Sequence, residues 1–378
     1  MRQIRNVRTG VFLPPHHNND EDVALCMQRD FDLLQWLEHL GFAEAWIGEH
    51  HSGGMQIYGS PELFIATAAE RTSRMKLGAG VVSVPYHNPY MIADRIVQLD
   101  YQTRGRAMFG FGPGMLVSDA AMLGIDPSQQ RARLVEGVDI IMRLIAGETV
   151  TQENDWYTLR NASLQMSPYS FPRPHMVVAT SKTPTGSRLA GKYGFGILTH
   201  GAGDVASSWK VAEEAGEEHG NTMSRDDLRV VVSFHLAESR QDALREMEFG
   251  LEPWMHYLDA LNPKSYADVR AKAGNDPDKI IAARGGLVGT PDDAVGFLEA
   301  LWEKTGGFGC VLMTSTNWMS FEATKRSYEL MMRYVMPRFN GANLQREASF
   351  DWVYENREGF SGANQAAIDK AVSAGGRT

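Results

Sequence analysis

The pair His50-His51 follows, after Glu49, a short run, Glu44–Gly48, whose residues predict a buried β-strand. Neighbouring residues on a strand point to opposite sides, so the two imidazoles are poorly placed to share a metal ion. A single imidazole at a strand end suits proton transfer, because its pKa lies near neutrality. Structural packing of both histidines is the other interpretation, and the residues by themselves leave the choice open.

A second candidate region follows the apolar run Lys76–Val82. Gly80 lacks a side chain, which would let a planar ligand rest on the backbone, and Ser83 and Asn88 offer hydrogen-bonding groups to its polar edge. Gly112, at the end of another apolar run, also keeps bulk away from a ligand. The alternative is purely local, since an asparagine followed by proline is a typical helix start.

Hydroxyl, glycine and basic residues gather in the segment ATSKTPTGSR, residues 179–188. At the start of a helix, free backbone N–H groups and the positive end of the helix dipole favour a phosphate group. Ordinary capping of the helix by a serine or threonine is the alternative interpretation. The residues expected at the phosphate are Ser181, Thr185, Gly186 and Ser187, with Lys182 and Arg188 as nearby cations.

Short apolar runs alternate along the chain with longer amphipathic segments, a pattern typical of βα units around a parallel sheet. Eight such runs favour a closed (β/α)₈ TIM barrel, an α/β fold in which reactive groups lie at the C-terminal ends of the strands. All three candidate regions fall at such ends. The predicted strands are Thr9–Leu13, Glu44–Gly48, Lys76–Val82, Ala107–Phe111, Met176–Ala179, Gly196–Thr199, Arg229–Leu236 and Gly309–Met313.

Two helices can be delimited from apolar periodicity and stop signals. The first is predicted over Val23–Leu40, and Gly41 ends it. The last is predicted over Phe321–Met336, and Pro337 ends it.

A single domain, residues 1–340, is predicted to hold the barrel and two insertions. The insertion at about 151–167 has the pattern of a hairpin, and the one at about 252–286 is long enough to act as a lid or binding loop. Residues 341–378 are predicted to form a polar tail or an arm between subunits.

Composition narrows the class of partner. The chain of 378 residues has a formal net charge of −9, which argues against nucleic acid or an anionic membrane as a partner. Its two cysteines, Cys26 and Cys310, form no ligand motif, so no metal site is predicted and a reducing compartment is expected. Without a signal peptide or a long apolar run, the sequence predicts a soluble, cytoplasmic protein.

Several stretches together resemble the luciferase-like flavin-dependent monooxygenases, which have a TIM barrel of the bacterial-luciferase type. They are AWIGEHH at 45–51, the segment 78–82 with the following Asn88-Pro89, and DYQTRGRAMFGFGPG at 100–114. The resemblance covers about the first 200 residues well and the rest more loosely.

This resemblance implies a two-component monooxygenase. FMN would arrive in reduced form from a separate flavin reductase, and O₂ would serve to oxygenate a small apolar organic substrate, by terpene-like epoxidation or Baeyer–Villiger oxidation. His50 matches the family's catalytic histidine. The resemblance also implies a homodimer.

The resemblance further implies where the cofactor lies. The flavin would sit at the barrel mouth over a cis peptide bond between Gly80 and Val81, with its phosphate near the 181–187 segment. Gly112 stands where luciferases carry a reactive cysteine, and Pro113 where they carry a phosphate-contacting arginine, which speaks against light emission. Apolar residues expected to line a substrate pocket are Met55, Ile57, Tyr58 and Trp318.

Two other functions are compatible with the same barrel. One is hydride transfer with a deazaflavin, which involves no oxygen chemistry. The other is a non-catalytic flavin-binding protein, against which the histidine and the phosphate-segment hydroxyls speak.

Overall fold

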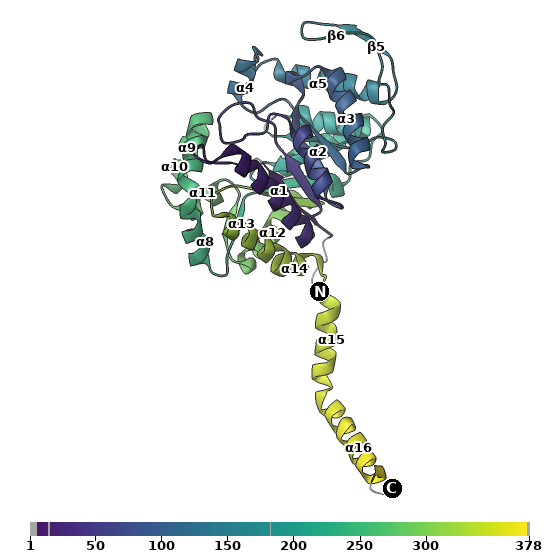
Figure 1. Cartoon of the computed structure of the whole chain (residues 1–378), viewed down its shortest axis with the longest axis vertical. Helices are drawn as coiled ribbons and strands as arrows, with labels where there is room; N and C mark the ends of the chain where they lie inside the picture. The colour runs from purple at the N-terminus through teal and green to yellow at the C-terminus, as the bar shows by residue number, and fades with distance from the viewer. Residues whose placement is uncertain (1–5, 14–15, 182, 376–378) are drawn as a thin grey trace. The chain divides into compact units, whose positions relative to one another are not determined.

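The computed structural model describes residues 6–13, 16–181 and 183–375, and the chain divides into a main unit, Val7–Val335, and a second unit that begins at Met336. In the main unit, eight parallel strands close into a barrel in the order β1-β12-β9-β8-β7-β4-β3-β2, which confirms the predicted fold. Figure 1 shows the helices of this unit packed around the strands. The strands are β1 (Arg8–Leu13), β2 (Glu44–Ile47), β3 (Lys76–Ser83), β4 (Ala107–Gly112), β7 (His175–Thr180), β8 (Gly196–His200), β9 (Leu228–Val232) and β12 (Cys310–Thr314).

Helices connect successive barrel strands. The first, α1, spans Val23–Leu40 as predicted and ends at Gly41, whose positive φ of 92° suits glycine. The others between barrel strands are α2 (Pro61–Arg71), α3 (Pro89–Thr103), α4 (Val117–Met122), α5 (Gln130–Ile145), α6 (Thr185–Tyr193), α7 (Val205–Glu218) and α12 (Pro291–Thr305), with α13 (Phe321–Leu330) after β12.

The seventh predicted strand, Arg229–Leu236, is wrong in its extent. β9 ends at Val232, and β10 (Phe234–Leu236) leaves the barrel to pair in parallel with β11 (Leu287–Gly289). The carbonyl of Ser233 accepts the N–H of Leu287 at 2.9 Å, so the change of partner takes place at this residue. The residues on both sides are buried, and a continuous apolar run therefore concealed the break.

The predicted end of the last barrel helix at Pro337 is also wrong. A π-helical turn, Met331–Val335, follows α13, and α14 spans Met336–Asn340. Pro337 is the second residue of α14, and the π-helical turn directly before α14 changes the hydrogen-bond pattern where the missing N–H would otherwise interrupt the helix.

The two predicted insertions have structure of their own. The first contains the antiparallel pair β5 (Val150–Glu153) and β6 (Thr158–Ala162). The segment after β10 is helical, and its apolar side packs into a cluster that includes Trp254, Met255 and Trp318. Its helices are α8 (Arg240–Glu246), α9 (Leu251–Leu261), α10 (Pro263–Ala273) and α11 (Pro277–Ala283).

The second unit contains two further helices, α15 (Leu344–Glu355) and α16 (Arg357–Gly375), neither of which has a buried residue. The tail expected from the sequence is thus helical over its described part. Nowhere in the described ranges is a helix both long and apolar enough to cross a bilayer.

Candidate active site

The carboxyl ends of the barrel strands bring most of the predicted residues to one mouth. His50 follows β2, Ser83 ends β3, Gly112 ends β4, and Ser181 and Trp318 follow β7 and β12. Since parallel strands all end at the same rim, five separate stretches of the chain meet there.

The imidazole of His50 faces Asp119, a residue of α4 that the sequence did not indicate. Nδ1 of His50 lies 3.5 Å from Oδ2 of Asp119, and both atoms are buried without a hydrogen-bond partner among the described residues. Burial works against ionisation of Asp119, but contact with His50 and a hydrogen bond from Ser52 outweigh it and lower the pKa of Asp119. A charged carboxylate beside Nδ1 keeps the proton on that nitrogen and leaves Nε2 for chemistry.

Glu49 joins three neighbouring groups beneath His50. Its Oε1 accepts hydrogen bonds from Nε2 of His51 (3.0 Å) and of His87 (2.6 Å), and its Oε2 accepts the N–H of Ser83 (2.6 Å). Burial raises the pKa of Glu49, but these bonds outweigh burial and bring it to about 2. The bond to Glu49 in turn raises the pKa of His51. The carboxylate of Glu49 thus holds His51, His87 and the end of β3 in place relative to one another.

The β3–β4 edge, where the resemblance implied a flavin cradle, has two backbone irregularities. The Gly80-Val81 bond is cis, and the register between β3 and β4 shifts at this point. A Cβ on Gly112 would lie 2.4 Å from Cγ2 of Val81, so the glycine makes room for that side chain. Asn88 lies apart from this group: it is exposed, and its Oδ1 caps α3 by accepting the N–H of Tyr90 at 2.9 Å.

The predicted phosphate segment forms the start of α6. Pro184 stands at the N-cap, and no side chain caps the helix, so capping by serine or threonine is not what the segment does. Gly186 lies against β7, where a Cβ would be 2.5 Å from the carbonyl oxygen of Ala179. Thr185 is half-buried, Ser187 is buried and Ser181 is exposed. Lys182 lies outside the described residues, and Arg188 is exposed.

A cation that the sequence did not indicate reaches the same segment. Nε of Arg131, the second residue of α5, donates a hydrogen bond to Oγ1 of Thr183 at 3.4 Å. Oγ1 of Thr180, at the end of β7, is buried without a partner among the described residues. A gap of 52 positions separates the two hydrogen-bonded residues, so no local pattern could have connected them.

The four predicted substrate-pocket residues divide into two groups. Met55, Ile57 and Tyr58 lie in the loop after β2, where the hydroxyl of Tyr58 donates to Oδ2 of Asp30 at 2.8 Å. Trp318 is fully buried, and its ring packs edge-on against Trp254 with centroids 5.0 Å apart. Its indole N–H lacks a hydrogen-bond partner among the described residues.

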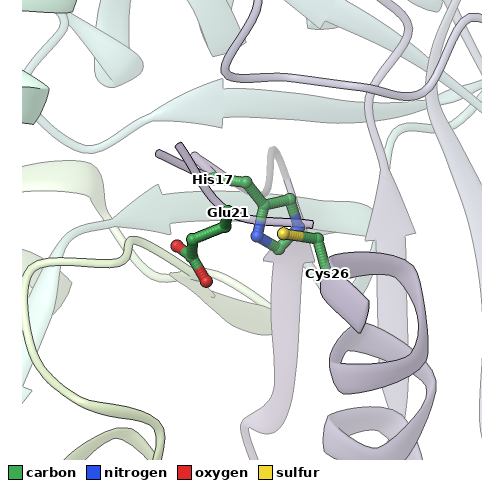
Figure 2. Close-up of side chains that lie close together, drawn as sticks. All are labelled: His17, Glu21 and Cys26. Carbon is green, nitrogen blue, oxygen red and sulfur yellow. The ribbon is translucent and has the colours of Figure 1, made fainter. Parts of the chain in front are cut away.

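His17, Glu21 and Cys26 come together near the end of β1 (Figure 2). Nδ1 of His17 accepts a hydrogen bond from Arg29 at 2.7 Å, and its Nε2 donates to Asp30 at 2.8 Å. Arg29 also donates to Glu21 at 2.7 Å. Both imidazole nitrogens are therefore engaged, and the cluster is a hydrogen-bond network in which Arg29 supplies the positive charge.

Buried polar atoms without a partner concentrate at the mouth. Nine such side-chain atoms occur among the described residues. Two belong to His175, which begins β7, and to His235, which lies in β10 outside the barrel, and the other seven belong to residues at the carboxyl ends of barrel strands or in the segments that follow. Buried polar groups are normally satisfied, so this concentration indicates a binding site for a polar ligand. The seven residues are His16, His50, Gln56, Asp119, Thr180, Thr316 and Trp318.

Comparison with known proteins agrees with this geometry. The chain is 43% identical to limonene 1,2-monooxygenase of Rhodococcus erythropolis, over 96% of this chain and 94% of the relative. It is 42% identical to 4-hydroxyprotoasukamycin monooxygenase of Streptomyces nodosus subsp. asukaensis, over 93% and 97%. The fold is similar to that of the oxygenating constituent of 3,6-diketocamphane monooxygenase from Pseudomonas putida in complex with FMN, with a TM-score of 0.75, 22% identity, and coverage of 88% and 98%.

Residues 7–307, which include seven of the eight barrel strands and the helical insertion, match the luciferase-like monooxygenase family. The resemblance to this family that the sequence motifs indicated is thereby confirmed. The chain is an enzyme that belongs to the luciferase-like monooxygenases.

Proposed function

We propose that this enzyme is the oxygenating component of a two-component, FMN-dependent monooxygenase that acts on a small, largely apolar organic substrate. The observation that carries the proposal is the group of seven residues with unpartnered buried polar atoms at the barrel mouth. Nδ1 of His50 and Oδ2 of Asp119 face each other at 3.5 Å. A cofactor with a polar ring edge, a phosphate and a nearby reacting oxygen would supply partners for the other atoms. The homodimer and the cytoplasmic location expected from the sequence stay predictions.

The described residues fit FMN at three points. The uncapped start of α6, with Thr185, Gly186 and Ser187 in its first turn, would bind the phosphate. Arg131 would add the positive charge that Pro113 cannot supply. The Gly80-Val81 backbone would face the ring system.

His50 is proposed to move the proton in the reaction. Asp119 holds a proton on Nδ1 of His50, so Nε2 can give or take one at the reacting oxygen. When bound, the reduced flavin supplies the two electrons with which O₂ is divided, one oxygen atom entering the substrate and the other leaving as water.

Exclusion of water would fall to the apolar side chains at the rim. Met55 and Trp318 are buried, and Ile57 is partly buried. A dry site limits the loss of reduced cofactor to hydrogen peroxide, because bulk water no longer supplies protons freely.

The test couples the purified protein to FMN, NADH and a flavin reductase from another source, under ¹⁸O₂. Limonene serves as the alkene and camphor as the ketone. We expect oxygenated product with one ¹⁸O atom per molecule, only when FMN and reductase are both present. A reduced deazaflavin supplied without FMN is the control for hydride transfer. Absence of any affinity for FMN in either redox state would contradict the proposal.

A further inference from the structure

Arg284 carries a positive charge that the described residues leave without a counter-ion. It stands directly after α11, and its Cζ lies 5.1 Å above the ring of Trp254. Burial lowers its pKa, and no charged neighbour among the described residues opposes that effect. The face of an aromatic ring attracts a guanidinium, but it does not replace a carboxylate partner.

The neighbours of Arg284 place it over the mouth. Trp254 packs against Trp318, after β12, and its ring centroid lies 6.5 Å from that of His16, after β1. The next residue, Gly285, approaches Ala202, just beyond β8, so closely that a Cβ there would be 2.7 Å from that alanine's Cβ. The guanidinium therefore lies above the β12–β9–β8 side of the rim.

The strand order separates this position from the flavin cradle. In the closed barrel, β12 and β9 lie across the ring from β4 and β3. Gly80, Val81 and Gly112 belong to β3 and β4. A molecule lying between the two sides would thus meet the cradle on one side and Arg284, with aromatic rings around it, on the other.

Two imidazoles near Arg284, those of His16 and His200, are uncharged at neutral pH. Burial, together with the charges of His50 and Arg284, lowers the pKa of His16 to about 3. Burial also lowers the pKa of His200, at the end of β8, and Arg284 contributes. Both imidazoles are therefore neutral, and a bound anion would interact with the guanidinium.

We propose that Arg284 binds an anionic group of the substrate, so that the substrate class is a small apolar ring compound that carries a carboxylate. The inference rests on the proposed function for the reaction itself. It adds that the apolar part faces Trp318 and the flavin side of the mouth, while the carboxylate pairs with Arg284. A neutral hydrocarbon would leave this charge unpaired.

The experiment measures binding in the absence of flavin. The full chain is titrated with 3-cyclohexenecarboxylate and with its methyl ester, and binding is followed by tryptophan fluorescence, since Trp254 and Trp318 lie beside the site. We expect the carboxylate to bind at least tenfold more tightly than the ester. Arg284→Gln should weaken carboxylate binding at least tenfold and leave ester binding within twofold, and Arg284→Lys should lie between. Arg270→Gln, which removes the half-buried partner of the exposed Glu252 in the same insertion, is the matched control.

Equal affinity of the wild type for acid and ester would overturn the proposal, and this comparison decides even if the Gln variant fails to fold. Competition of inorganic phosphate with the carboxylate in the wild type, lost in Arg284→Gln, would also overturn it, because Arg284 would then belong to the cofactor's phosphate. A separate FMN titration distinguishes the two proposals: loss of flavin affinity there contradicts the proposed function, while Arg284-dependent carboxylate binding stands.

Discussion

The two ends of the barrel treat buried charge in opposite ways. At the amino-terminal end, Glu44 accepts hydrogen bonds from Arg229 at 2.7 and 3.0 Å, from Arg8 at 3.1 Å and from Trp46 at 2.9 Å. Both carboxylate oxygens of Glu44 therefore have hydrogen-bond partners. At the mouth, seven residues have polar atoms without a partner.

The difference teaches how to separate structural from functional polarity in this fold. A hydrogen-bond network in which every buried group has a partner stabilises the barrel but has no donor or acceptor free for a ligand. A network with unpartnered buried groups lowers the stability of the protein unless a bound ligand supplies the missing partners. His175 tests the distinction, because its Nε2 is unpartnered although it begins β7 at the amino-terminal end. Because His175 lies at the end of the barrel opposite the mouth, we expect it to have a structural role and no role in the reaction.

The largest expected effect is on His50. His50→Ala should lower the rate of oxygenated product formation by a factor of about 10² to 10⁴, the usual range for loss of a group that transfers a proton. His175→Ala, which removes an unpartnered imidazole from the opposite end, should leave that rate within about twofold. The measurement is the initial rate of product formation at fixed FMN and reductase, with circular dichroism to check folding. Equal loss in both variants would remove the distinction between the ends.

A smaller effect is expected at Glu44. Burial raises the pKa of Glu44, but the Arg229 guanidinium outweighs it and lowers the pKa to about 2, from 4.5. A lowered pKa in the folded state stabilises the protein above pH 4.5, and this contribution is lost as the pH falls towards 2. Glu44→Gln should therefore reduce the free energy of unfolding at pH 7 by about 3 kcal/mol.

Urea unfolding at pH 7 and pH 3 measures this contribution. The variant should lose less stability than the wild type between the two values, because its amide does not titrate. Glu148→Gln, which affects only an exposed pair with Arg143, should change stability by less than about 1 kcal/mol. An equally steep pH dependence in Glu44→Gln would show that the saturated network does not stabilise the barrel.

The barrel was largely predictable because its signals are local. Each strand is a buried run, and α1 was delimited correctly by periodicity and a glycine stop. The errors arose where a local pattern has two outcomes. Apolar residues continue through Ser233 although the strand changes partner there, and Pro337 can end one helix or stand near the start of another.

The mouth was predictable only in part, for the same reason. His50 and the α6 segment are local motifs, and the expected cis bond at Gly80-Val81 is present. The residues that complete the site come from distant positions: Asp119 binds the loop after β2 from 67 positions away, and Arg131 reaches Thr183. Such pairs form only when the barrel closes, so a short stretch of sequence cannot predict them.

The smallest predicted effect concerns Asn88, which the sequence placed with the cofactor and the structure places at the cap of α3. Asn88→Ala should reduce the free energy of unfolding by about 1 kcal/mol, the usual cost of losing such a cap. Affinity for FMN should stay within twofold of the wild type, because the capping oxygen is already engaged. Flavin titration and urea unfolding of one preparation measure both quantities. Weaker FMN binding with unchanged stability would instead indicate that Asn88 contacts the flavin. It would also mean that a hydrogen bond to a backbone N–H does not identify a residue as purely structural.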